Sequence, residues 1–109
     1  MTYYVYMLTN KGRTVLYIGV TNDLQNRMRW HWTTEKNSFV KRYNLDRLAF
    51  YEEYGHVLDA IAREKQLKRW NREKKNDLVR RLNPKCEDLF VTIFGASMRD
   101  PSTSVGMTS

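Results

Sequence analysis

One segment decides the fold expected of this chain: Tyr17-Ile18-Gly19-Val20-Thr21-Asn22-Asp23-Leu24-Gln25-Asn26-Arg27-Met28-Arg29-Trp30-His31. It begins with residues typical of a strand, and residues 21–23 are of the types that cap a helix N-terminus, because their side-chain oxygens accept backbone N–H groups. From Leu24 onward, helical spacing puts Arg27 and His31 on the same stripe as the apolar Leu24 and Met28. A cation and an imidazole on an apolar stripe, close to the strand-end Tyr17, indicate a functional site.

The rest of the pattern predicts a small α+β domain. Aromatic and branched residues predict strands at 2–8, 14–20 and 47–54, and the turn at 10–13 contains Gly12, which takes a positive φ at no steric cost. Helices are expected at about 22–34, at 39–43 after a Ser38 cap, and along 57–82, with Asn71 as a candidate break and Pro84 as the end. The folded domain is expected to span 1–90, with 91–109 as a largely disordered extension.

Composition narrows the class of protein. A length of 109 residues suits one domain with a modest core. The single cysteine, Cys86, cannot form an internal disulfide and has no Cys or His at metal-ligand spacing. No apolar run approaches the length of a membrane span, and the N-terminus lacks a signal-peptide pattern. These features favour a soluble cytoplasmic protein with no membrane partner.

The positive charge is concentrated in one region. Residues 61–85 include ten basic and three acidic residues, so they carry the whole formal net charge of +7 while the rest of the chain is neutral. A positive field confined to one helical region is typical of a surface that binds a polyanion. The alternative interpretation is a solvated, lysine-rich helix with no such partner.

Glu64 does not fit a purely structural helix. Projected at 100° per residue, it falls in the middle of an apolar side made by Ala60, Ile61, Leu67, Leu78, Val79 and Leu82. An ionised carboxylate is costly to bury unless it has a cation or metal partner. The pattern leaves three alternatives: a buried ion pair with an arginine, a boundary residue that reaches water, or a metal ligand.

Five side chains have ordinary structural explanations one by one but together suit phosphodiester hydrolysis: Tyr6, Tyr17, Arg27, His31 and Glu64. A carboxylate can hold a hard divalent ion, which keeps most of its waters and polarises a phosphoryl group. An arginine presents a planar fork to phosphate oxygens. A tyrosine becomes a general base only where nearby cations favour its phenolate.

The spacing of these residues resembles a known family. Tyr4-Val5-Tyr6, ten intervening residues and Tyr17-Ile18-Gly19 are similar to the paired signature of the GIY-YIG nuclease superfamily. The similarity continues through Arg27 and His31 to Glu64 and covers roughly residues 1–90. The runs at 39–44 and 60–70 look like the small single-domain bacterial branch related to the excision-repair nuclease subunit UvrC.

The resemblance implies a three-stranded antiparallel sheet flanked by helices and hydrolysis of DNA phosphodiesters with one Mg²⁺ or Mn²⁺ ion. It makes Tyr6 and Tyr17 the motif tyrosines, one a general base and the other a positioning hydrogen-bond donor, without deciding which is which. It assigns phosphate binding to Arg27, a further catalytic position to His31 and the metal to Glu64.

Further expectations follow from the same resemblance. Gly19 matches the motif glycine, whose missing side chain would let phosphate approach the strand end. The family's late polar residue has two candidates, Asn76 and Asn83, and the first motif departs from the pattern because Tyr4 replaces its glycine.

The basic stretch is expected to contact the phosphates of DNA, or of RNA as a variant substrate. The residues assigned to this role are Lys65, Lys68, Arg69 and Arg72, with Gly19 and Arg27. The alternative from another class is a nucleic-acid-binding module that acts with a partner protein and turns over poorly or not at all.

Overall fold

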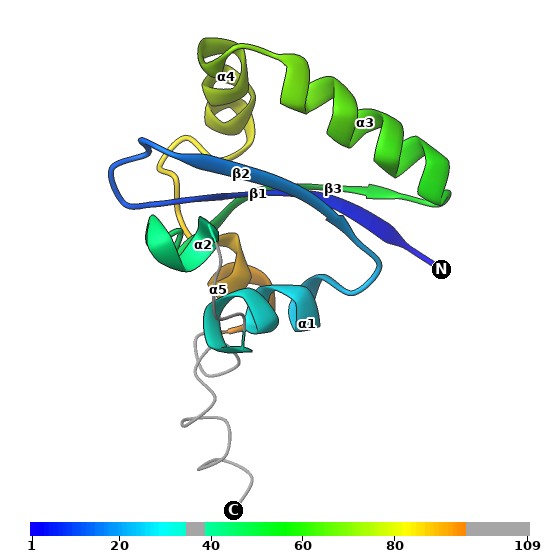
Figure 1. Cartoon of the computed structure of the whole chain (residues 1–109), viewed down its shortest axis with the longest axis horizontal. Helices are drawn as coiled ribbons and strands as arrows, with labels where there is room; N and C mark the ends of the chain where they lie inside the picture. Colours follow the sequence, from blue (N-terminus) through cyan, green and yellow to red (C-terminus); the bar gives the residue numbers. More distant parts are fainter. Residues whose placement is uncertain (35–38, 96–109) are drawn as a thin grey trace, which may run out of the picture.

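The computed structural model of the chain describes residues 1–34 and 39–95. A three-stranded sheet lies between two layers of helices, with α3 and α4 on one face and α1, α2 and α5 on the other (Figure 1). In chain order the elements are β1 (Tyr3–Thr9), β2 (Leu16–Thr21), α1 (Leu24–Arg29), a π-helical turn η1 (Trp30–Thr34), α2 (Phe39–Arg42), β3 (Arg47–Tyr54), α3 (Val57–Arg69), α4 (Arg72–Leu82) and α5 (Leu89–Phe94).

The sheet is antiparallel with the order β2-β1-β3, so β1 is central and β2 forms an edge. The predicted α+β class and three-stranded sheet are confirmed. The prediction for Gly12 was wrong, because Arg13 takes the left-handed conformation with φ 56°. Asn10 organises this turn, with its carbonyl accepting from the Arg13 N–H at 3.0 Å and its side chain from the Thr14 N–H at 2.9 Å.

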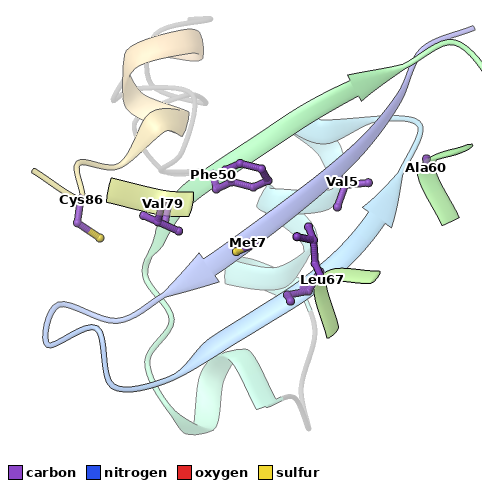
Figure 2. Close-up of a cluster of buried hydrophobic side chains, with 9 residues drawn as sticks. Val5, Met7, Phe50, Ala60, Leu67, Val79 and Cys86 are labelled. Carbon is purple, nitrogen blue, oxygen red and sulfur yellow. The ribbon is translucent and has the colours of Figure 1, made fainter. Parts of the chain in front are cut away.

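Alternation along β1 builds a separate core on each face of the sheet, because successive strand side chains point to opposite faces. Val5 and Met7 point toward α3 and α4, where they join a fully or nearly buried cluster (Figure 2). That cluster consists of Val5, Met7, Ile18, Ala49, Phe50, Ala60, Leu67, Val79 and Cys86. Through Ala60, Leu67 and Val79, this core packs the basic helices α3 and α4 against the sheet.

The intervening residues Tyr6 and Leu8 point to the other face. They pack with Leu24 and Met28 of α1, and the remaining members of this second core are Val40, Leu45, Leu48 and Phe90. Asp23 caps α1 as predicted, since its carboxylate accepts from the Asn26 N–H at 3.1 Å. Helix α1 therefore begins at Leu24, three residues after the end of β2 at Thr21.

The predicted long helix is two helices. Asn71 caps α4 by accepting from the Lys74 N–H at 2.8 Å, which confirms it as the break and new cap. The single apolar side projected through 57–82 was partly wrong, because Leu82 is exposed. Trp70 leaves the helical conformation with ψ 148°, so the faces of α4 do not continue those of α3.

Helix α5 crosses the boundary expected at residue 90. Phe90 is buried in the second core, and Phe94 stacks on it at 4.9 Å between ring centroids. The folded body therefore includes the whole of α5. Ser38 and the tail 96–109, for which a cap and disorder were expected, lie outside the described residues. Within the ranges 1–34 and 39–95, no helix has the length and apolar character needed to span a membrane.

Candidate active site

Strand register brings the two candidate tyrosines together. Tyr6 pairs with Gly19 and Leu8 pairs with Tyr17, so Tyr6 and Tyr17 are diagonal neighbours on one face. Their ring centroids are 6.2 Å apart. Tyr6 is buried, whereas Tyr17 is half-buried at the edge of the sheet. Of the two phenols, Tyr17 is therefore the one that a substrate can reach more easily.

His31 holds the buried tyrosine. Its Nε2 lies 2.9 Å from the Tyr6 hydroxyl, in a buried hydrogen bond whose direction depends on the imidazole tautomer. Its ring also lies against Tyr17, with 5.3 Å between centroids. His31 belongs to η1, and single π-helical turns of this kind occur frequently at functional sites. The predicted juxtaposition of His31 with both tyrosines is present.

The position of the Tyr6 side chain requires glycine at position 19. A Cβ at position 19 would lie 2.5 Å from the Tyr6 hydroxyl oxygen and 2.6 Å from its Cζ, distances that no real Cβ contact tolerates. The space above Gly19 is therefore filled by the Tyr6 ring. Gly19 therefore has a packing role that its match to the motif did not predict, and the approach of phosphate to this strand end stays a prediction.

This contact predicts that Gly19→Ala destabilises the fold. The methyl group would overpack the buried Tyr6, which we expect to lower the free energy of unfolding by about 1–3 kcal/mol. Urea denaturation measures the change. Gly55→Ala is the matched control, because a Cβ at that position would have no heavy atom within 4 Å beyond its own and the adjoining residues. A surface change of this type stays within about 0.5 kcal/mol. Equal effects at the two positions would contradict the packing argument.

Glu64 is a boundary residue with a lysine partner. Its side chain is 20% exposed, and a carboxylate oxygen lies 3.5 Å from Lys68 Nζ, one helical turn along α3. The neighbouring Arg63 points elsewhere, because Glu52 of β3 accepts from both its Nε at 2.9 Å and a terminal nitrogen at 3.2 Å. This hydrogen bonding raises the pKa of Arg63. A third nitrogen of Arg63 donates to the Gln66 side chain at 2.7 Å, and the cation paired with Glu64 is Lys68.

A pocket joins this part of α3 to the edge of the sheet. It is lined by Leu16, Tyr17, Ile18, Phe39, Lys68 and Lys75. Lys68 thus lines the same pocket as Tyr17 and is also the ion-pair partner of Glu64, so the basic helical region extends to the Tyr17 pocket. Lys75 of α4 was not among the predicted site residues. Lys75 was counted with the basic residues of the sequence. Its place at the pocket could not be predicted, because the break at Trp70 sets the orientation of α4 relative to β2.

Arg27 is exposed, so its expected place on the buried stripe was wrong. Leu24 and Met28 fill the second core, while the Arg27 guanidinium lies 5.2 Å above the Trp30 ring. Trp30 in turn contacts His31, with 5.2 Å between ring centroids. Arg27 is linked to the tyrosine pair through these two rings and lines a hollow with Asn22 and Asp23.

The other predicted phosphate contacts are spread over different surfaces. Lys65 is exposed on α3, and Arg69 lines a shallow hollow with Tyr54 and Arg63. Arg72 is exposed and donates to the Arg13 carbonyl at 3.3 Å. Of the four lysines and arginines predicted on the basic stretch, Lys68 is the one that lines the Tyr17 pocket.

The structure separates the two candidate asparagines. Asn83 is buried and holds the turn after α4, donating to the carbonyls of Ala49 at 3.1 Å and Glu87 at 2.8 Å and accepting from the Glu87 N–H at 3.0 Å. It therefore has a structural role. Asn76 lines a pocket with Arg13, Leu16 and other residues, next to the one that contains Tyr17.

A divalent ion at this site would have one carboxylate from the protein. No group of three or more His, Cys, Asp or Glu side chains able to hold a metal occurs in the parts of the chain that the structure describes. Mg²⁺ in phosphate-processing sites is bound through one or two carboxylates, waters and substrate phosphates. The partly exposed carboxylate of Glu64, beside a basic pocket, fits such a hydrated ion.

Comparison with known proteins decides the family. The family model of the GIY-YIG catalytic domain matches residues 2–83. This chain belongs to the GIY-YIG family. The GIY-YIG catalytic domain is a nuclease domain, so the function of the chain is of the nuclease type and its substrate class is nucleic acid.

A solved structure supports the same fold. The GIY-YIG chain is similar to the UPF0213 protein BH0048 from Bacillus halodurans, whose structure was determined by solution NMR. The two are 25% identical with a TM-score of 0.52, over 85% of this chain and 98% of that one. The search of curated proteins found no significant match.

Proposed function

We propose that this GIY-YIG protein is an endonuclease that hydrolyses DNA phosphodiester bonds with Mg²⁺ or Mn²⁺. The observation that carries the proposal is the pocket at the β2 edge. There a half-buried tyrosine, Tyr17, lies beside Lys68, and Lys68 is paired with the carboxylate of Glu64. A base, phosphate-binding cations and a metal-binding carboxylate are the groups that hydrolysis of a phosphodiester requires.

Tyr17 is the general base in this proposal, and Tyr6 is a positioning residue. Tyr17 lines the pocket, where its phenolate form would accept a proton from the attacking water and become the neutral phenol. Tyr6 is buried and hydrogen-bonded to His31, so it acts by holding the imidazole and the neighbouring phenol in place. The greater exposure of Tyr17 and its place in the pocket support this choice between the two tyrosines.

Cations on three elements bind the phosphates. Lys68 and Lys75 supply two positive charges at the pocket, and Arg27 supplies a planar guanidinium at the end of the row Arg27–Trp30–His31. Such groups stabilise the charge that grows on the phosphoryl oxygens in the transition state. Glu64 would hold the divalent ion, which when bound polarises the phosphoryl group and stabilises the leaving oxygen.

Cleavage of supercoiled plasmid tests this function. We expect nicking in the presence of Mg²⁺ or Mn²⁺ and its complete loss when a chelator is added. Nicking that continues in the chelator would contradict the metal-dependent mechanism. One observation favours the alternative of a binding module, since Lys68 already provides Glu64 with a cation. A binding module would retain DNA in the chelator and never cut it.

Salt dependence tests the phosphate contacts separately. For three phosphate contacts the affinity for duplex DNA should fall about 40-fold between 50 and 200 mM salt, because each contact releases condensed counterions. Lys75→Met should lower the slope of log K against log salt by about 1. Lys85→Met, at an exposed position after α4, is the control and should leave the slope unchanged. Fluorescence anisotropy measures the affinity of each protein at each salt concentration. A slope near zero for the native protein would contradict the proposed phosphate contacts.

A further inference from the structure

A row of aromatic rings leads from the buried tyrosine to the surface. Tyr6 and Tyr17 are 6.2 Å apart, Tyr17 and Phe39 are 6.4 Å apart, and Phe39 and Tyr43 are 4.7 Å apart, measured between ring centroids. Phe39 is 46% exposed and Tyr43 is 40% exposed, although both are large aromatic residues. The short helix α2 and the residue that follows it therefore present two open rings, Phe39 and Tyr43, beside the pocket that contains Tyr17.

These rings are surrounded by positive charge. The Arg42 guanidinium lies 5.6 Å above the Tyr43 ring, and Lys68 and Lys75 line the same pocket as Phe39. Alternating aromatic faces and cations are the groups with which proteins bind single-stranded nucleic acid, since the rings stack on bases and the cations contact the backbone. Burial in the core does not account for Phe39 and Tyr43, because much of each ring is open to solvent.

We propose that Phe39 and Tyr43 stack on unpaired bases next to the cleaved phosphate, so that the substrate is single-stranded at the site. This inference deepens the proposed nuclease function and rests on it for the position of the cleaved bond. In a continuous duplex the base faces are stacked on one another, and a protein ring cannot reach them unless a base is displaced. The aromatic row therefore favours single strands, flaps and loops over unbroken duplex.

The chemistry that the rings recognise is the face of a nucleobase, which DNA and RNA share. The 2′-hydroxyl distinguishes the two sources, and single strands of DNA and RNA with the same sequence are the two arms that compare them. If the proposal is right, Phe39→Ala weakens the binding of both the DNA and the RNA single strand, whichever of the two binds more tightly to the native protein.

Binding without cleavage tests the proposal. Anisotropy is measured in a chelator with a labelled 20-nucleotide single strand and with its duplex. Phe39→Ala should weaken single-strand binding between about 5-fold and 150-fold, the range found when a stacked ring is replaced by alanine, and should change duplex binding less than 2-fold. Phe39→Trp should restore single-strand binding. A 2-aminopurine in the strand should be quenched by the native protein and less so by Phe39→Ala.

Control variants keep the test decisive. Leu58→Ala, at an apolar position that is 76% exposed on α3, should leave both affinities unchanged. Tyr43→Ala repeats the test if Phe39→Ala fails a thermal melt. Equal losses for single strand and duplex, or no loss for either, would overturn the stacking proposal. Metal-dependent nicking tests the nuclease function independently, so native-like nicking by Phe39→Ala with unchanged single-strand binding would refute this inference and leave the function intact.

Discussion

Glu64→Gln is expected to lower metal-dependent nicking of plasmid by at least about 100-fold. The amide keeps the size of the side chain but removes its negative charge, and a bound metal ion contributes several kcal/mol of charge stabilisation in phosphoryl transfer. The fold should survive, because Glu64 is a boundary residue whose ion-pair partner, Lys68, is itself more than half exposed. Gel quantification of nicked and supercoiled plasmid gives the rate, and circular dichroism checks the fold.

A matched carboxylate separates this effect from a change of net charge. Glu53 is exposed on β3, and Glu53→Gln alters the net charge by the same amount. We expect its nicking rate to remain within about 2-fold of the native rate, since surface substitutions away from a site are usually near neutral. Full nicking by Glu64→Gln would point to a contaminating nuclease or to a different site.

Tyr17→Phe is expected to lower the rate of nicking by about 10²–10⁴-fold, the usual contribution of a general base. The substitution removes one oxygen from a half-buried side chain and retains the ring contacts with Tyr6, His31 and Phe39. KM should change little, because the phosphate-binding cations remain. Steady-state kinetics on a short oligonucleotide would separate kcat from KM.

Tyr6→Phe should behave differently. It removes the buried hydrogen bond to His31, so the free energy of unfolding should fall by about 1–3 kcal/mol along with a partial loss of activity. Tyr3→Phe is the control on β1, since Tyr3 packs against the core on the opposite face of the sheet. If Tyr6→Phe abolished cleavage while Tyr17→Phe left it intact, the two roles would be reversed.

The local elements of this protein could be predicted because their signals lie within one turn or one strand. Asp23 and Asn71 cap helices through backbone N–H groups three residues away. The strand at 47–54 is observed with the predicted bounds. That Tyr6, Tyr17 and His31 lie together could also be predicted, because the family resemblance relates residues that are distant in the chain.

Tertiary structure alone decided how these elements meet. Gly19 has a packing role that only the structure shows, because the ring of the cross-strand Tyr6 occupies the space where a Cβ would lie. Asn83 has a structural role that the sequence did not show, because its side-chain amide donates a hydrogen bond to the Ala49 carbonyl of β3.

By itself the sequence determined the α+β class, the capped helices, the concentration of positive charge and the residues of the GIY-YIG signature. Only the tertiary structure decided that Lys75 and Phe39 join Tyr17 at one pocket, while Arg27 turns outward. The physical reason is that capping and alternation depend on near neighbours. Pocket composition instead depends on strand register, on the break at Trp70 and on the packing of two cores against one sheet.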